Sequence, residues 1–392
     1  MKQILALILC CCMMFAMAAC AEKPAPTQPS TTAQTETTAT TVPTTESTEP
    51  TIPLSTAVYK APLACVSLPV ITETEKNGTT TLSYYSYPGL SLVLPDADVA
   101  EVVKLDLMNR IGSTATAAQA IHEAAKRDYS NQSDWYNYYM DVSYGVERLD
   151  QNVLSLFGTE STFDGSPSST TIGVSANYDL STGTSLTLKS IMFPDFSADV
   201  LTDLIIEGLA EYDTASLLPG YEEVIEQMFS TNVPVESWYF SSTGLCFYFA
   251  PYEIAPQSMG IIYSHIPYTS LNGLMKEAYF PMDDLVYAGT VSISPLDELD
   301  SEVLESFEQF GELTIGEGGT KYLLTADGSV LNLRIYEATT DNAPGKTLHA
   351  SAGMGPGNAV LLDLPSEITT LQVSFESNGE TILTSFSVPT EQ

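Results

Sequence analysis

Residues 238–271 constrain the fold more than any other part of the chain, because aromatic strand-forming residues alternate there with turn signals. Trp238–Phe240 and the apolar run 245–250 flank a Ser-Ser-Thr-Gly turn, which is typical of a β-hairpin. A third apolar run at residues 261–266 predicts another strand. We therefore expect a small sheet here.

Two prolines, Pro251 and Pro256, bracket the segment between the second and third of these strands. Each proline biases the preceding residue toward extended backbone, so we expect an extended strap and not a helix. Glu253 lies inside this strap and either bonds a turn or faces a ligand. After the third strand, the apolar spacing of residues 270–279 predicts a closing helix.

The residues before this stretch predict strands and a long helical region. Residues 84–94 are aromatic and strand-forming, and residues 96–111 repeat apolar side chains at helical spacing, with Asp96 or Asp98 suited to the N-cap. The alanine-rich residues 115–127 should continue the helical region after a break at Gly112.

Further strands are predicted downstream. Residues 135–148 and 152–157 alternate as strands joined by a turn, and a loop should follow at 158–169. The run 173–190 begins as a strand and leaves through a tight turn, for which Gly183 supplies the backbone freedom. A helix is expected at residues 198–210.

Two runs of the sequence resemble the extracellular domain of the anti-sigma-V factor (RsiV-like) family. One run carries the pattern N-x-D-L-x-T-G-x-x-L-x-L, beginning at Asn177. The other consists of Phe249, Tyr252, Glu253, Ile254, Ala255, Pro256, Gly260, Ile266, Pro267 and Tyr268. The resemblance implies an α+β domain of helices and antiparallel sheet. Its best-characterised relative is a receptor that binds lysozyme, and the family's domain also occurs beside polysaccharide-deacetylase domains.

The resemblance also indicates where a ligand would bind. Family members commonly carry a Gly-Gly-Ala-His-Gly type loop before the first run, whereas the corresponding residues 163–170 contain no histidine. If the family's loops contact a ligand, the ligand here can differ. We place the candidate binding site at Tyr252, Glu253, Tyr268, Phe163 and Asp164.

The start of the chain predicts the compartment. Lys2 precedes an apolar run that ends in Met17-Ala18-Ala19-Cys20, which is typical of a secretory signal. A cysteine directly after small residues indicates a lipoprotein, lipidated at Cys20 and anchored on the extracellular face of a bacterial cytoplasmic membrane. A transmembrane anchor is disfavoured, because the run is shorter than the roughly 20 residues that a span needs.

The rest of the chain divides by composition. Residues 1–20 form the predicted signal peptide, and residues 21–57 are rich in Thr and Pro and should be a disordered linker. We assign residues 58–283 to the RsiV-like domain. Residues 284–392 show short runs at 285–293, 321–324, 330–336, 359–362, 371–376 and 382–388, with a short acidic helix or loop at 296–310. This pattern predicts a small C-terminal β-sandwich.

The charge balance bears on the partners. The chain has 14 Lys and Arg against 49 Asp and Glu, a net charge of −35. Such a field repels nucleic acid and steers cationic partners toward the protein. High negative charge can also serve solubility alone.

Catalytic and metal-binding patterns are absent from the sequence. The three histidines, His122, His265 and His349, lie far apart and without metal-type spacing, so we predict no metal and no cofactor. His122 should be a surface residue of its helix. Cys65 and Cys246 remain after the signal, and either one disulfide bridge or buried free thiols fits them.

These observations favour a cell-surface lipoprotein that binds or senses without catalysis. A basic protein such as a lysozyme-like muramidase, or a cell-wall component, is the expected partner. One alternative is an enzyme, or an enzyme accessory, acting on cell-wall glycan, in which Glu253 would be the acid. The other is a purely structural surface protein.

Overall fold

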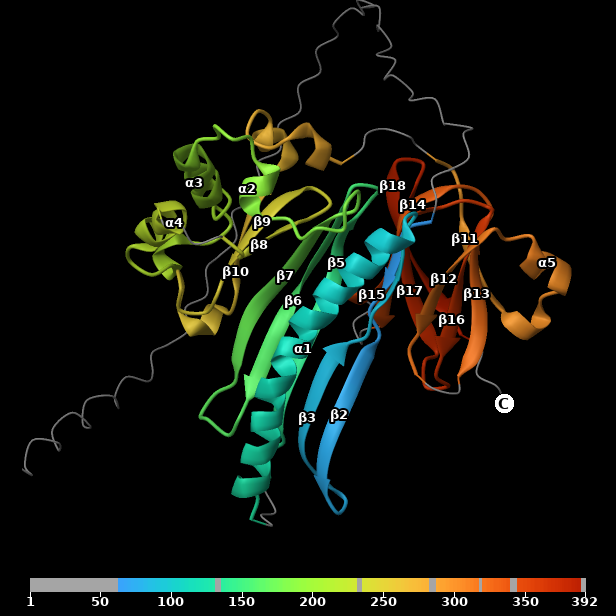
Figure 1. Ribbon diagram of the computed structural model, residues 1–392, viewed down its shortest axis with the longest axis horizontal. Coiled ribbons are helices and arrows are strands. Elements are labelled where there is room, and N and C mark those ends of the chain that lie inside the picture. Colours follow the sequence, from blue (N-terminus) through green and yellow to red (C-terminus); the bar gives the residue numbers. More distant parts are fainter. Residues whose placement is uncertain are drawn as a thin grey trace, which may run out of the picture. The chain divides into compact units, whose positions relative to one another are not determined.

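The computed structural model describes residues 63–130, 135–230, 235–281, 287–316, 319–338 and 344–388. The predicted signal peptide, Cys20 and the linker lie outside these residues. The α-helices are α1 (Ala97–Asp128), α2 (Leu188–Ile191), α3 (Ala198–Glu207), α4 (Tyr221–Ser230) and α5 (Ser301–Glu305). The strands are β1 (Cys65–Ser67), β2 (Val70–Asn77), β3 (Thr80–Pro88), β4 (Ser91–Val93), β5 (Tyr138–Leu149), β6 (Val153–Phe163), β7 (Thr170–Asp179), β8 (Trp238–Phe240), β9 (Gly244–Phe249), β10 (Ile262–Pro267), β11 (Val291–Pro295), β12 (Gln309–Thr314), β13 (Thr320–Ala326), β14 (Val330–Ala338), β15 (Pro344–Met354), β16 (Asn358–Leu364), β17 (Thr370–Ser377) and β18 (Glu380–Ser387) (Figure 1).

The strands form four sheets. Their orders are β2-β3-β5-β6-β7, β10-β9-β8, β18-β17-β14-β15-β1-β4 and β11-β13-β16-β12. Neighbouring strands are antiparallel except for the parallel pairs β3–β5 and β12–β16. The protein is therefore of the α+β class, with a β-rich C-terminal region, as the sequence predicts.

Helix α1 packs across the five-stranded sheet (Figure 1). It begins at Asp96, whose carboxylate accepts the backbone N–H groups of Asp98 and Val99 and thus caps the helix. The predicted break at Gly112 is wrong, because buried residues continue at helical spacing beyond it and hold the next turns on the sheet. The buried residues of α1 are Val99, Ala100, Val103, Leu107, Ile111, Ala118, Ile121 and Ala125.

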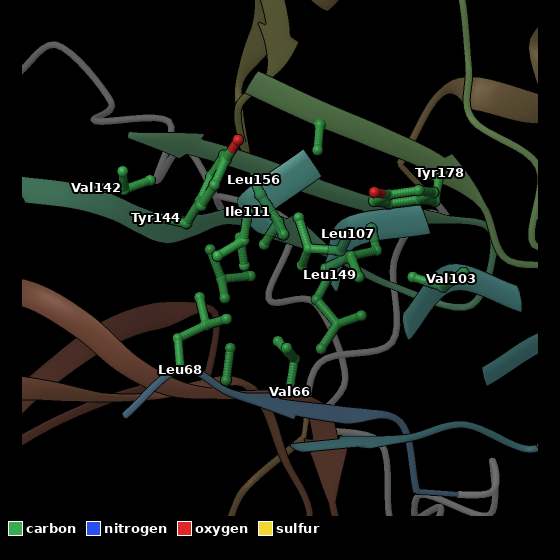
Figure 2. Packing of buried hydrophobic residues seen from close by; sticks show 14 of the residues in the cluster. Val66, Leu68, Val103, Leu107, Ile111, Val142, Tyr144, Leu149, Leu156 and Tyr178 are labelled. Atoms are coloured by element: carbon green, nitrogen blue, oxygen red, sulfur yellow. The ribbon is translucent and has the colours of Figure 1, made fainter. Parts of the chain in front are cut away.

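The core beneath α1 also includes residues from the start of the chain. Val66 and Leu68 lie in the same apolar cluster as Leu107 and Leu156 (Figure 2). Tyr144 and Tyr178 enter this cluster from β5 and β7. Residues near β1 therefore stabilise the α1 core.

The predicted hairpin is confirmed as β8 and β9, with β10 as the third strand. Helices α2, α3 and α4 share one apolar cluster with this sheet, while Tyr239, Cys246 and Tyr248 pack on Phe157 of β6. The predicted closing helix is wrong. In its place the chain makes two 3₁₀ turns, Tyr268–Leu271 and Glu277–Tyr279, separated by a bridge between Met192 and Met275.

The six-stranded and four-stranded sheets share one apolar cluster. Strands β1 and β4 belong to this six-stranded sheet, although they come from the segment that we assigned to the preceding domain. Strands β12 and β15 were not predicted. All residues of β15 after residues 344–346 are buried. Its sequence therefore lacks the alternation of apolar and polar residues that marks a half-buried strand.

Two smaller expectations are corrected, and one alternative that the sequence left open is decided. The first half of the predicted loop at 158–169 is strand, since β6 extends to Phe163. His122 is only partly exposed, and its Nδ1 lies 2.7 Å from the Ser83 hydroxyl. Cys65 and Cys246 are free and buried in separate apolar clusters, so they do not form a disulfide. None of the helices described here is long and apolar enough to cross a membrane.

Candidate binding site

The predicted strap is a compact turn and not an extended segment. The Tyr252 N–H donates to the carbonyl of Ala255 at 3.0 Å, and the Glu253 N–H donates to that of Ala250 at 3.0 Å. Tyr252 has a φ of 71°, in the left-handed region that costs an ordinary residue about 1–2 kcal/mol. The two prolines exclude a helix, but they are compatible with this turn.

Two of the predicted site residues lie on this turn. The Tyr252 side chain is 66% exposed, and its hydroxyl donates to Gln257 Oε1 at 3.0 Å. Glu253 Oε2 accepts the N–H of Ala250 at 2.8 Å. The Glu253 carboxylate thus closes its own turn, whereas the Tyr252 ring faces solvent.

Tyr268 lies in a different setting. Its hydroxyl donates to the carbonyl of Ser241 at 2.8 Å and accepts from Arg148 Nη1 at 2.8 Å. Burial raises the pKa of Tyr268 to about 12. This phenol is therefore neutral and fully engaged in the fold.

Phe163 and Asp164 lie where β6 turns toward β7. The Phe163 ring contacts the rings of Tyr138 and Tyr139. Asp164 accepts from the backbone and hydroxyl of Ser166, and these bonds lower the pKa of its carboxyl. Among the residues that the structure describes, no hydrogen bond, ion pair or ring contact joins these two residues to Tyr252, Glu253 or Tyr268.

A cleft of about 470 Å³ lies elsewhere, beside strand β7. One wall comes from α1 and the α1-facing side of the five-stranded sheet. The other comes from the segment before β8 and from β9. The lining residues are Arg110, Ile111, Ser113, Thr114, Val142, Tyr144, Glu160, Gly173, Val174, Ser175, Ala176, Asn177, Ser185, Leu186, Thr187, Val235, Glu236, Ser237, Trp238 and Tyr248.

The alternation of the strands explains which side chains enter this cleft. Tyr144 on β5 and Leu156 on β6 both face α1 (Figure 2), and Glu160 lies on the same side of β6, because residues four apart share one face of a strand. Gly173 on β7 leaves room for the Tyr248 ring, since a Cβ atom there would lie 2.5 Å from it.

The polar groups of the cleft differ in their pairing. Arg110 Nε donates to Asp106 at 2.8 Å, and its Nη2 donates to the Ser185 hydroxyl at 3.0 Å. The Tyr248 and Ser175 hydroxyls lie 3.1 Å apart. In the described residues, no hydrogen bond or ion pair reaches the Glu160 carboxylate, and desolvation raises its pKa.

This arrangement suits binding of a polar ligand with a cationic group. An unpaired carboxylate at the edge of an apolar wall attracts a cation more strongly than one in bulk water. Sequence reasoning missed Glu160, because we expected residues 158–169 to be a loop. The described residues contain no group of His, Cys, Asp and Glu that could hold a metal ion.

Comparison with known proteins adds a family match for part of the chain. Residues 193–269 match a family model described as a protein of unknown function, DUF3298. This segment spans α3, α4 and the β8–β10 sheet. No curated protein matches the chain.

Two solved structures are similar to this chain. A member of the DUF3298 family from Bacteroides fragilis is 18% identical, with a TM-score of 0.38, and the match covers 54% of this chain and 94% of that one. A DUF3298 family protein from Pseudomonas aeruginosa is 15% identical, with a TM-score of 0.36, and the match covers 57% of this chain and 98% of that one.

Proposed function

We propose that this chain is a lipoprotein of the RsiV-like kind, lipid-anchored through Cys20 on the extracellular face of a bacterial cytoplasmic membrane. We propose further that it binds a cationic protein without catalysis. A lysozyme-like muramidase is the first candidate partner, and a cell-wall component is the second.

The observation that carries this proposal is an uncompensated acidic surface on α3 and α4. No Lys or Arg occurs between Lys189 and Lys276. Asp199, Asp203 and Glu207 repeat at a spacing of four along α3, and all three are exposed. Glu222, Glu223 and Glu226 are exposed on α4, which packs against α3.

The acidic surface lowers the stability of the helix that carries it. Like charges four residues apart on a helix destabilise it by about 0.2–0.5 kcal/mol per pair, and no ion pair compensates α3 among the described residues. A basic partner would relieve this repulsion and would also be steered to the surface.

The test is calorimetric titration of the purified chain with a basic lysozyme, at low and at physiological salt. We expect saturable one-to-one binding that persists at physiological salt, where free charges are screened over about 8 Å. Heat that disappears with added salt would contradict the proposal. No release of reducing ends from peptidoglycan is expected of the chain.

A matched pair of triple variants localises the binding. We expect Asp199→Asn, Asp203→Asn and Glu207→Gln together to weaken binding roughly tenfold. The control, Glu298→Gln, Glu302→Gln and Glu305→Gln, removes the same charge from exposed residues in and beside α5 and should leave the affinity unchanged. Equal losses in both variants would show that net charge alone attracts the lysozyme.

A further inference from the structure

Strand β7 ends the five-stranded sheet (Figure 1), and part of its outer edge has no partner strand. On that edge, the carbonyl of Asn177 accepts the N–H of Leu186. In an antiparallel ladder the backbone groups of alternate residues point to the same side, so those of Gly173 and Ser175 point to this edge as well. Within the described residues, no backbone hydrogen bond to another segment occupies them there.

The open edge lies in the cleft described above. Gly173 and Ser175 both line it, together with Ile111 and Val142 on the α1 side. A strand added to this edge would lie about 4.8 Å from β7 and would direct alternate side chains toward the α1 side and toward Tyr248.

We propose that the open edge of β7 binds an extended peptide as an added strand, with a lysine side chain of that peptide directed at Glu160. Unpaired strand edges are templates for such pairing. The aliphatic part of the lysine would pack over Val174, which faces the α1 side of β7 in the cleft, while its ammonium group reaches the carboxylate on β6. Arg110 does not oppose this charge, because it already pairs with Asp106.

A second copy of the chain is a poorer occupant of the edge. Each copy carries a net charge of −35, and like charges at a contact oppose association. The inference goes beyond the proposed function, since it does not require the acidic surface of α3 and α4.

The test uses two end-blocked pentapeptides, Thr-Val-Lys-Val-Thr and Thr-Val-Gln-Val-Thr, titrated up to millimolar concentration into the purified chain. We expect saturable binding of the lysine peptide, about tenfold tighter than that of the glutamine peptide, and slower hydrogen exchange of the Gly173 and Ser175 amides. The absence of such protection at saturating peptide would overturn the proposal.

Variants separate strand addition from charge attraction. Ser175→Pro removes an outward N–H but no bond to β6, and we expect it to lower the affinity at least tenfold. Thr171→Pro is the equivalent change two outward positions earlier and serves if Ser175→Pro does not fold. Glu160→Gln should make the affinities of the lysine peptide and the glutamine peptide equal. Binding that needs Glu160 but tolerates both proline variants would show a side-chain site only and would overturn strand addition.

Discussion

At the scale of single residues, Arg148 connects three separate segments of the chain. Its side chain is 4% exposed. Nε donates to Asp150 at 2.7 Å, and Nη1 donates to the Tyr268 hydroxyl at 2.8 Å and to the carbonyl of Tyr279 at 2.6 Å. The guanidinium also lies over the rings of Phe240 and Tyr268. Tyr268, which we predicted as a site residue, is thus part of the link between β5 and the β8–β10 sheet.

We expect Arg148→Ala to lower the free energy of unfolding by about 3–5 kcal/mol, because it leaves the Asp150 carboxylate without its buried partner. Arg148→Lys should recover only part of this loss, since an ammonium group does not reproduce the planar fork of donors. Urea unfolding measures the free energy of unfolding of both variants. The control is Arg127→Ala, which breaks an exposed pair with Asp128 and should cost less than about 1 kcal/mol. Equal effects of the two alanine variants would contradict this role for Arg148.

At the scale of elements, α1 shows that packing can override a local helix breaker. Gly112 is exposed in the middle of the helix, and a Cβ atom there would meet nothing within 4 Å. The apolar residues on both sides of it face the same sheet. Their burial stabilises the helix more than one glycine weakens it.

We expect Gly112→Ala to raise the free energy of unfolding by about 0.5–1 kcal/mol, because alanine restricts the unfolded chain and favours the helix. Thermal unfolding followed by circular dichroism measures the change. Gly158→Ala on β6 is the opposite case, since its Cβ would lie 1.7 Å from the carbonyl oxygen of Ser143. It should destabilise the protein by roughly 1–3 kcal/mol. A destabilising Gly112→Ala would show that the helix is strained at that position.

At the scale of the whole described region, a buried histidine links the first strand to the C-terminal sheets. His349 on β15 is fully buried, with Nδ1 2.7 Å from the Ser67 hydroxyl of β1 and Nε2 3.1 Å from that of Ser351. The Ser67 hydroxyl also donates to the carbonyl of Glu312 on β12 at 2.5 Å. Burial lowers the pKa of His349 to about 3 and raises that of nearby Cys65 to about 12, so both side chains are neutral at pH 7.

This lowered pKa predicts a loss of stability in acid. The pKa of His349 falls from 6.5 when unfolded to about 3 when folded, so its contribution is complete above pH 6.5 and is lost as the pH falls toward 3. We expect the difference in unfolding free energy between the protein and His349→Gln to change by about 1.4 kcal/mol per pH unit in this window. Urea unfolding at several pH values measures it. His265→Gln alters an exposed histidine and should not change the slope. A pH-independent difference would contradict a neutral, buried His349.

The sequence by itself determined the elements whose signals are local. The hairpin of β8 and β9, the Asp96 cap of α1 and most C-terminal strands follow from turn residues, capping side chains and apolar periodicity, which act over a few neighbouring residues. The α+β class follows from these elements. The proposed lipid anchor at Cys20 also rests on a local pattern, and it stays a prediction.

Only the tertiary structure decided where polar groups meet. One cleft is lined by Glu160, Tyr248 and Arg110, although they come from β6, β9 and α1. These residues are far apart in the sequence, so no local pattern predicts that they meet. The pairing of β1 with β15 also has no local signal, because most of the chain separates these two strands in the sequence. Glu253 is the opposite case. It stands out in the sequence as part of the family resemblance, but in the structure its carboxylate closes its own turn. Periodicity sets which face of an element is apolar, whereas burial against distant partners sets which charged group stays unpaired.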